Sequence, residues 1–223
     1  PLTVLAGFLE TIQDLKLDAQ RVRDYVGLMA PQAEGMKRLI EDLLTLSALE
    51  HAPAASPAQR VAVRPLLERV RTEAEALSVG RHRISLAIEG EHDLAGAESE
   101  IASAFLNLVT NAVRYTPKGG TIRLQWRASQ KGAEFSVEDT GIGIEPEHIP
   151  RLTERFYRVD RSRSRETGGT GLGLSIVKHA LARHQATLEI QSAPGKGSRF
   201  TARFPGVRLV AAERLGEEDR SIP

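Results

Sequence analysis

DTGIGI at residues 139–144 begins the part of this chain that decides its fold. A second glycine-rich stretch, GGTGLGLS, follows at 168–175, and the helical-looking stretch NLVTNAVRY precedes both at 107–115. The glycines do not have the spacing of a P-loop, nor do they form a Gly-x-Gly-x-x-Gly motif placed after a strand, as in a Rossmann site. Together the three stretches predict a magnesium–nucleotide site of another kind.

The first stretch belongs to a predicted helix from about Ala97 to Tyr115. At about 100° per residue, one face collects apolar side chains and nearly the opposite face collects polar ones. The apolar set is Ile101, Phe105, Leu108 and Ala112, and the polar set is Asn107, Asn111 and Arg114. Mg²⁺ takes oxygen ligands and bridges to phosphates, while a guanidinium offsets phosphate charge. A solvated helix face is the alternative, although asparagine is a poor interior helix former.

The DTGIGI stretch places a carboxylate, Asp139, at the end of a predicted strand. An ionised carboxylate only accepts hydrogen bonds, so it suits an amino group such as that of adenine. Gly141 and Gly143 let the backbone approach a flat ring where a side chain would clash. An ordinary Asp-Gly turn at a strand end is the alternative.

The GGTGLG stretch opens a predicted helix at 171–184, where free amide groups suit phosphate oxygens. A flexible glycine loop without a ligand is the alternative. Between the two glycine stretches, residues 151–166 are basic and contain Phe156 and Tyr157. This composition fits a mobile cover over a triphosphate, or else a nucleic-acid-binding segment.

Composition narrows the classes of function. The chain has 223 residues, 30 basic and 29 acidic side chains and no cysteine. Length allows one or two domains, and the balanced charge gives no general attraction to nucleic acid. No apolar run reaches the roughly 18 residues that span a bilayer. Because the chain begins at Pro1 within a predicted helix, we expect a fragment, with any membrane attachment in missing upstream segments.

Residues 1–50 are predicted to form a helical hairpin around the turn at 16–18. Two apolar stripes support it: Leu2, Leu5, Leu9 and Ile12, and then Tyr25, Met29, Met36, Leu39, Leu43 and Leu46. Pro31 is expected to kink or locally break the second helix. The hairpin either dimerises into a four-helix bundle or packs on the rest of the chain as an ordinary core element.

The remaining chain divides into a linker at 51–60, an α/β domain at 61–205 and a charged tail at 206–223 that is expected to be disordered. Beyond the helices above, we predict a helix from Pro65 to about Leu77. Strands are predicted at 83–88, 121–126, 133–138, 187–190 and 198–204. The fold class is therefore α+β: a helical hairpin followed by an α/β sandwich with helices on one face of a mixed, largely antiparallel sheet.

These motifs, in this order, resemble the catalytic core of sensor histidine kinases, whose ATP-binding domain has the Bergerat-type fold of the gyrase/Hsp90/histidine-kinase/MutL superfamily. Residues 107–115 resemble the N box and 139–143 the G1 box. Residues 155–158 resemble the F box, 169–173 the G2 box, and 195–200 the last glycine turn of the family. Residues 1–50 resemble the dimerisation and histidine-phosphotransfer hairpin.

The resemblance implies binding of ATP and Mg²⁺. It implies that Asn111 is the Mg²⁺ ligand and that Asn107 supports the site. Asp139 would read adenine, with Gly141 and Gly143 shaping its pocket. The other implied nucleotide-binding residues are Arg114, Tyr115, Phe156, Tyr157, Arg158, Thr170, Gly171, Leu172 and Gly173.

The resemblance also implies an acceptor histidine, which would lie just before Pro1. The six histidines of the chain, at 51, 82, 92, 148, 179 and 184, are assigned to a linker, loops or the surface. The stretches PLTVLAGFLETI (1–12) and RLIEDLLTLSALE (38–50) look most like phosphate-regulon sensor kinases. The implied partners are a second copy of the chain and the receiver domain of a response regulator. The resemblance also implies that this chain is the cytoplasmic portion of a bacterial inner-membrane protein. The alternatives are another ATPase of the superfamily, a non-catalytic nucleotide-binding scaffold and, in a third class, a nucleic-acid-binding module.

Overall fold

The computed structural model describes residues 2–14, 18–51, 59–159 and 169–212. Several predictions fall outside these residues. They are residues 16–17 of the hairpin turn predicted at 16–18, residues 52–58 of the linker predicted at 51–60, and residues 213–223 of the tail predicted at 206–223. The end of the basic cover and Gly168, at 160–168, also lie outside the described residues.

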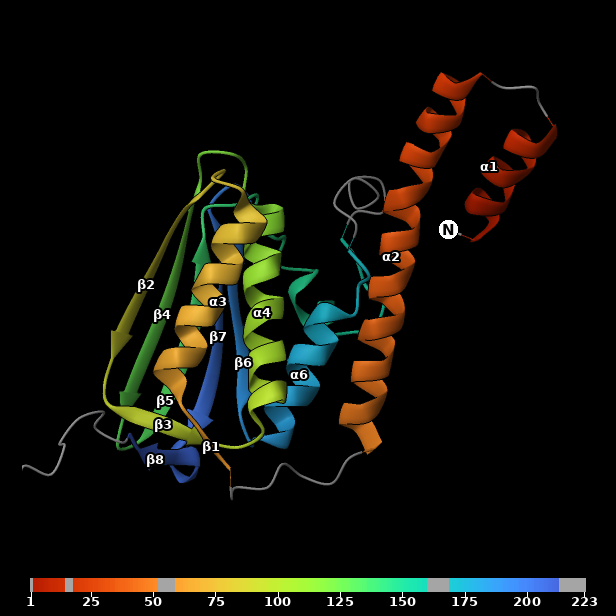
Figure 1. Cartoon of the computed structure of the whole chain (residues 1–223). Helices are drawn as coiled ribbons and strands as arrows, with labels where there is room; N and C mark the ends of the chain where they lie inside the picture. The colour runs from red at the N-terminus through yellow and green to blue at the C-terminus, as the bar shows by residue number, and fades with distance from the viewer. Residues whose placement is uncertain (1, 15–17, 52–58, 160–168, 213–223) are drawn as a thin grey trace, which may run out of the picture.

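The N-terminal hairpin consists of α1 (Leu2–Asp14) and α2 (Ala19–His51), as Figure 1 shows. The ring centroids of Phe8 and Tyr25 lie 5.6 Å apart and join the two helices. Pro31 was predicted to kink or locally break the second helix; the break does not occur, since α2 continues through it. Pro31 leaves the carbonyl of Gly27 without its helical donor, and both residues are exposed, so water can take that place.

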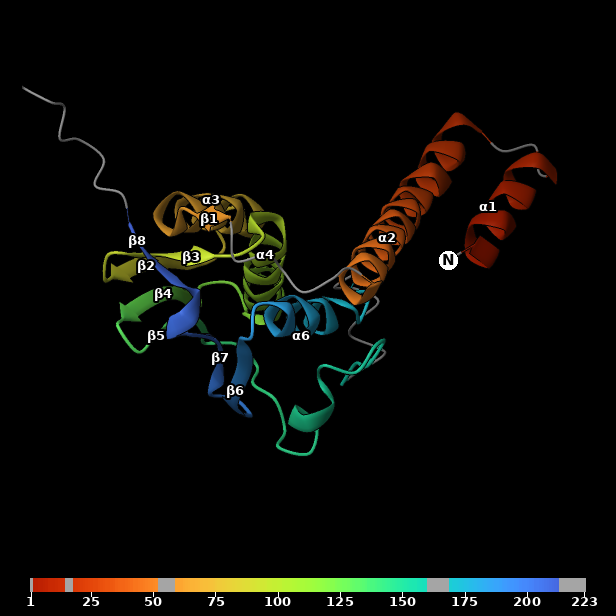
Figure 2. The same ribbon diagram turned by 90° about the horizontal axis from the view of Figure 1, so that it is seen from below.

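The larger sheet has five strands in the order β2-β4-β5-β7-β6. Only β2 and β4 are parallel, so the mixed, largely antiparallel sheet is confirmed. The strands are β2 (Arg83–Glu89), β4 (Thr121–Ser129), β5 (Gly132–Asp139), β6 (Thr187–Ala193) and β7 (Gly197–Pro205). Three helices cover one face of the sheet, as Figures 1 and 2 show: α3 (Val63–Ser78), α4 (Glu98–Tyr115) and α6 (Gly173–Arg183).

The core lies between this sheet and its helices. Ile122, Leu124 and Trp126 alternate along β4 and are fully buried, as the two-residue period of a strand requires. Phe105 of α4 stacks on Phe135 of β5 with ring centroids 4.0 Å apart. This contact fixes which face of α4 turns toward the sheet.

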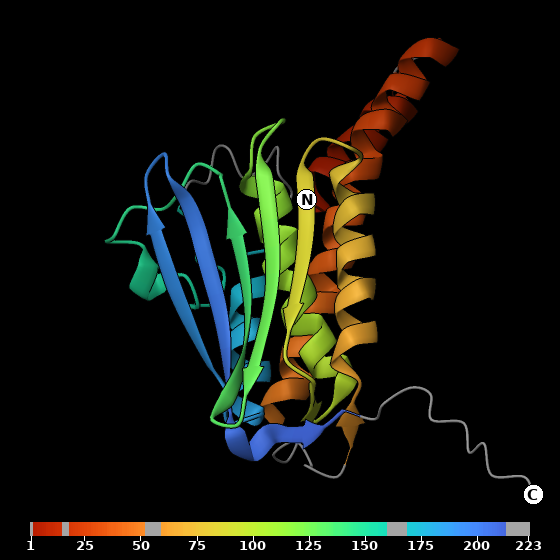
Figure 3. The same ribbon diagram turned by 90° about the vertical axis from the view of Figure 1, so that its left-hand side faces the viewer.

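A second, three-stranded sheet was not predicted. It has the order β1-β3-β8 and contains β1 (Arg60–Val61), β3 (His92–Ala95) and β8 (Leu209–Ala211), seen in Figures 1 and 3. The expectation that disorder begins after Pro205 was therefore wrong for residues 206–211. Leu209 pairs with Leu94, and the buried Arg208 donates to the carbonyl of Ala95.

The hairpin packs on the sandwich through the second half of α2, which runs beside α6 (Figures 1 and 2). Leu46 and Leu49 of α2 are buried and belong to the main core. The region between the glycine motifs is irregular as predicted, apart from the short 3₁₀ helix η1 (Ile149–Arg151). Among the described residues, no helix has the length and apolar character needed to cross a bilayer.

Candidate functional site

Helix α4 presents the two faces that its sequence predicts. The apolar set is buried: Ile101, Phe105, Leu108 and Ala112. The polar set is half-buried and turned away from the core: Asn107, Asn111 and Arg114. The sheet therefore holds one side of α4 and leaves its amides and guanidinium available.

The start of α6 lies directly against this polar face. Asn107 donates from Nδ2 to the carbonyl of Ser103 at 2.9 Å. A Cβ placed on Gly173 would lie 2.6 Å from Oδ1 of Asn107. Because that distance is too short for a side chain, glycine at 173 allows the second glycine turn to approach the asparagine face.

Asp139 stands at the end of β5, as predicted, and only 5% of it is exposed. Its Oδ1 accepts a hydrogen bond from the N–H of Gly141 at 2.7 Å. Burial raises the pKa of the Asp139 carboxyl, and the backbone N–H groups of Gly141 and Ser198 partly offset this. The carboxylate is thus fixed in direction by the turn that follows it.

The first glycine turn contacts the end of α4. The N–H of Ile142 donates to the carbonyl of Tyr115 at 3.2 Å. A Cβ on Gly141 would lie 2.6 Å from the same carbonyl oxygen. The motif containing Asp139 therefore sits against the last turn of the helix that carries Asn111.

The last glycine turn, at 195–200, closes the other side of the first. Gly143 has φ +69°, and a Cβ there would collide with the carbonyl of Ala193. The N–H of Gly195 donates to the carbonyl of Ile142 at 2.7 Å. Positive φ without steric cost is what glycine supplies here.

Phe156 of the predicted cover lies against the second glycine turn. Its N–H donates to the carbonyl of Gly171 at 2.9 Å. Phe156 has φ +60° and Gly171 has φ +76°, and a Cβ on Gly171 would lie 2.9 Å from Cα of Phe156. A left-handed phenylalanine is uncommon, and 57% of this residue is exposed.

Tyr157, which is predicted to anchor the cover, contacts two residues that the sequence did not reveal. Its hydroxyl lies 2.8 Å from Nδ1 of His148. The guanidinium of Arg151 lies over its ring, 4.3 Å from the centroid, in a cation–π contact. These contacts hold the segment that leads directly into Arg158.

Two arginines border the second glycine turn. A Cβ on Gly169 would lie 3.0 Å from Nη1 of Arg114 and 3.7 Å from Nη2 of Arg158. Burial is the main cause of the lowered pKa of Arg114. Tyr115 opposes this shift, while the positive charges of Arg38 and Arg158 add to it.

Thr170 and Leu172 shape the same turn. Thr170 Oγ1 accepts a hydrogen bond from the N–H of Leu172 at 3.2 Å. Leu172 is fully buried, and its carbonyl accepts from the hydroxyl of Ser175 at 2.7 Å. The amides at the start of α6 are therefore held by local contacts.

The residues present suit a magnesium ion that is bound mainly through nucleotide. The described part of the chain contains no group of three histidine, cysteine or carboxylate side chains that could hold a metal. Asn111 offers one amide oxygen on a half-buried polar face. Mg²⁺ commonly takes one or two protein oxygens and completes its shell with phosphates and water, so this donor set fits it.

Two acidic residues of α2 join this region, and the sequence reading missed both. Asp42 accepts a hydrogen bond from the hydroxyl of Thr170 at 2.6 Å. Glu50 forms an ion pair with Arg155 and lies 3.2 Å from Nε2 of His179. Asp42 and Glu50 lie four residues before and after the buried Leu46, so all three share one face of α2. This spacing could have predicted from the sequence that both acidic residues face the domain.

His184 corrects the assignment of all six histidines to linkers, loops or the surface. Only 1% of it is exposed. Its Nδ1 lies 2.7 Å from the carbonyl of Ala180, and its Nε2 accepts from the N–H of Ala97 at 3.0 Å. Burial lowers the pKa of His184. A neutral imidazole therefore ties the end of α6 to the start of α4.

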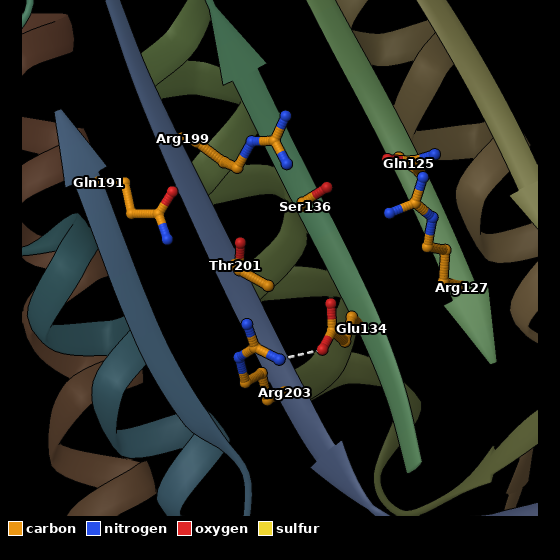
Figure 4. A pocket seen from close by; sticks show the side chains of 8 residues that line it. All are labelled: Gln125, Arg127, Glu134, Ser136, Gln191, Arg199, Thr201 and Arg203. Atoms are coloured by element: carbon orange, nitrogen blue, oxygen red, sulfur yellow. Dashed lines mark hydrogen bonds and ion pairs between the residues drawn. The ribbon is translucent and has the colours of Figure 1, made fainter. Parts of the chain in front are cut away.

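The uncovered face of the larger sheet is a separate surface, shown in Figure 4. It bears a hollow of about 60 Å³ lined by Gln125, Arg127, Glu134, Ser136, Gln191, Arg199, Thr201 and Arg203. Arg203 pairs with Glu134 and Glu189, and Arg127 pairs with Glu89. These side chains lie on the side opposite the helices, so they are not part of the glycine-lined site.

Two family descriptions match the chain. Residues 96–208 match "Histidine kinase-, DNA gyrase B-, and HSP90-like ATPase". Residues 1–52 match "His Kinase A (phospho-acceptor) domain".

Similar proteins fall in the same group. The phosphate regulon sensor protein PhoR of Pseudomonas aeruginosa is 54% identical over 216 residues, covering 96% of this chain and 49% of that protein. The protein of the same name from Haemophilus influenzae is 37% identical over 205 residues, covering 92% and 48%. The chain thus spans about half the length of the curated relatives it matches.

Solved structures agree on the fold. Full-length ShkA in complex with AMPPNP superposes with a TM-score of 0.72 at 25% identity, covering 96% of this chain and 44% of that one. The Acinetobacter baumannii histidine kinase AdeS gives a TM-score of 0.70 at 23% identity, covering 92% and 94%. The predicted hairpin and sandwich are confirmed by these likenesses.

Proposed function

This chain belongs to the histidine kinases of the histidine kinase-, DNA gyrase B- and HSP90-like ATPase family, and we propose that it binds Mg-ATP and starts a phosphoryl relay. The γ-phosphoryl group passes to a histidine of the hairpin and then to an aspartate of a response regulator. The proposal depends on one observation: both glycine turns contact α4. Gly173 of the second turn lies against Asn107, and Ile142 of the first turn lies against Tyr115. Phe156 on Gly171 adds the cover to the same site.

Each proposed role rests on a position in this site. Asp139, with its direction fixed by Gly141, accepts from the amino group of adenine. Arg114 and Arg158, which border Gly169, neutralise phosphate oxygens. Asn111, supported by Asn107, supplies an amide oxygen for Mg²⁺, whose charge would stabilise the phosphates once bound.

In this reaction the residues of the site form no covalent bond to the nucleotide. A ring nitrogen of the acceptor histidine attacks the γ-phosphorus, the bond to the β–γ bridging oxygen breaks, and ADP leaves with that electron pair. In the second step an aspartate oxygen attacks the same phosphorus and the P–N bond breaks. Both steps depend on in-line positioning and charge neutralisation, which the glycine turn and the arginines provide.

The acceptor histidine is expected just upstream of Pro1, at the start of the hairpin. Leu39, Leu43 and Leu44 of α2 are substantially exposed in the single chain, which favours pairing with a second copy into a four-helix bundle. The similarity to the Pseudomonas aeruginosa relative favours phosphate-starvation signalling. On the same ground we propose attachment to the bacterial inner membrane through upstream segments, with this portion in the cytoplasm.

ATP titration with and without Mg²⁺ tests the proposal. The chain should bind ATP more tightly with Mg²⁺, and Asn111→Ala should remove most of that difference, a loss of about tenfold or more for a ligand to a bound cation. Thr110→Ala, the neighbouring change on α4, should keep it. Equal affinity with and without Mg²⁺ in the unmodified chain, or an Asn111→Ala chain that keeps its Mg²⁺ dependence, would contradict the assignment.

Restoring the upstream residues separates a kinase from a nucleotide-binding scaffold. With the acceptor histidine present, incubation with Mg-ATP should yield acid-labile phosphate on the hairpin. The same protein with that histidine changed to glutamine should yield none. Binding of ATP without any acid-labile phosphate would favour the scaffold.

A further inference from the structure

The helical hairpin carries a third arginine, Arg38, whose positive charge acts on Arg114 beside the second glycine turn. The turn is already bordered by Arg114 and Arg158, whose guanidinium nitrogens lie 3.0 and 3.7 Å from the Cβ position of Gly169. Those two arginines come from the ATP-binding domain. The third belongs to the hairpin, on α2.

Helical spacing from Asp42 places Arg38, whose own Nε donates to the carbonyl of Glu34 at 3.4 Å within α2. The carboxylate of Asp42 accepts from the hydroxyl of Thr170 at 2.6 Å, and Thr170 directly follows Gly169. Residues four apart on a helix lie on the same face, about 6 Å apart. Arg38 is four residues before Asp42 and half-buried, so it lies one helical turn along the face that touches the glycine turn.

The charges in this region support the same placement. Arg38 and Arg158 each lower the pKa of the buried Arg114 through their positive charge. The carboxylate of α2 in this region, Asp42, is engaged by Thr170. Three guanidinium groups gathered from three elements repel one another, and an anion with several oxygens relieves that repulsion by accepting from their planar forks.

We propose that Arg38 of the hairpin binds the terminal phosphate of a nucleoside triphosphate held by the ATP-binding domain. This inference rests on the proposed function and adds a phosphate contact to it. Arg38 approaches from the hairpin, where the acceptor histidine is expected. It therefore meets the phosphate that extends furthest from the adenine site, which is the group to be transferred.

This contact gives the hairpin a means to distinguish ATP from ADP. With ATP bound, Arg38 and the glycine turn hold one phosphate between them, and α2 stays against α6. After transfer, ADP no longer offers that phosphate. The hairpin then loses one contact with the nucleotide, while Arg114 and Arg158 still border the glycine turn.

The test measures dissociation constants for Mg-ATP and Mg-ADP in Arg38→Gln, with Lys37→Gln as the matched control. Lys37 is the neighbouring cation on α2, with its side chain 66% exposed and paired with Glu41 at 4.0 Å. Arg38→Gln should weaken Mg-ATP about five- to tenfold, as loss of a charge-assisted hydrogen bond does, and Mg-ADP less than about twofold. Lys37→Gln should change neither, and Arg38→Lys should restore part of the ATP affinity because it keeps the charge but loses the fork.

The outcomes separate this inference from the proposed function. An unmodified chain that binds no ATP contradicts both. An unmodified chain that binds Mg-ATP through Asn111, while Arg38→Gln binds it equally well, overturns only the role of Arg38. Equal weakening of ATP and ADP by Arg38→Gln also overturns it, since the arginine would then act on the domain and not on the terminal phosphate. Thermal unfolding of each variant identifies any loss that comes from misfolding.

Discussion

The hydroxyl of Thr170 donates to the carboxylate of Asp42 across 128 positions of sequence, with the two oxygens 2.6 Å apart. Thr170 belongs to the glycine turn at the start of α6, and Asp42 belongs to the hairpin. Two segments that the sequence assigns to different domains therefore share a hydrogen bond at the proposed phosphate site. We therefore expect movement of the hairpin to alter the shape of the glycine turn through this pair.

Breaking this pair should loosen the glycine turn. In Asp42→Ala, Thr170 loses its acceptor, and the hydrogen bond from the N–H of Leu172 to Thr170 becomes weaker. We expect hydrogen exchange at residues 170–176 to quicken about fivefold, which corresponds to about 1 kcal/mol. Glu41→Ala, the neighbouring carboxylate with its side chain 59% exposed, serves as the control. Exchange that is unchanged in Asp42→Ala would show that the turn holds its shape without the hairpin.

Asp139→Asn should select against adenine. The amide keeps an oxygen for the N–H of Gly141, so the turn is preserved, but it presents an N–H₂ group where adenine needs an acceptor. ATP affinity should fall about tenfold or more, because a buried polar mismatch is costly, whereas GTP affinity should not fall, because O6 of guanine is an acceptor. Glu138→Gln is the control, since Glu138 pairs with Arg199 on the uncovered face of the sheet. Equal ATP affinity in Asp139→Asn and the unmodified chain would refute the adenine role.

His184 should make the fold sensitive to mild acid. Burial lowers its pKa in the folded chain, whereas in the unfolded chain it titrates near the ordinary value of about 6.5. The unfolded chain thus binds a proton first as the pH falls below about 6.5, and the free energy of unfolding decreases there. At pH values well above 6.5 this contribution to stability is fully present.

Denaturant unfolding at pH 7.5 and 5.5 measures this effect. His184→Gln should unfold more easily at pH 7.5, by about 1–3 kcal/mol for a buried hydrogen-bonded group, but should lose less stability on acidification. His51→Gln, at the exposed end of α2, should keep the pH dependence of the unmodified chain. If His184→Gln also kept that dependence, other groups would be its cause.

The hairpin should carry the dimer. Leu9 lies in the predicted seam of α1 and is 48% exposed in the single chain, so a partner helix would bury it. Leu9→Arg places a charge in that seam and should shift sedimentation toward the monomer. Thr3→Arg, also exposed on α1 but off the seam, should sediment like the unmodified chain. A dimer that persists in Leu9→Arg would place the interface elsewhere.

Sequence periodicity was enough to predict elements such as α3, α4 and β4, because each of them buries one face. This periodicity directly predicts the polar and apolar faces of α4, and it predicts that β5 ends near Asp139. Such periodicity is not visible in β1 or β8, which have two and three residues, and their pairing depends on contacts distant in sequence. Pro31 does not end α2, because the carbonyl of Gly27, which Pro31 leaves without a helical donor, is exposed and can bond to water.

The motifs of the candidate site could be predicted from the sequence, but the side-chain contacts that hold these motifs in place could not. Glycine turns and asparagines are visible as local patterns. The contact of Tyr157 with His148, and that of Thr170 with Asp42, join side chains whose meeting depends on how α2 and the cover pack. His184 was misassigned because its burial comes from the start of α4, distant in sequence.

An amide NMR titration with Mg-ATP tests most directly whether the motifs form one nucleotide site. Resonances of Asn111, Gly141 and Gly171 should all shift along curves that fit a single dissociation constant, and omitting Mg²⁺ should move all three curves together. Different constants for the two glycine turns, or a shift confined to one of them, would contradict a shared site.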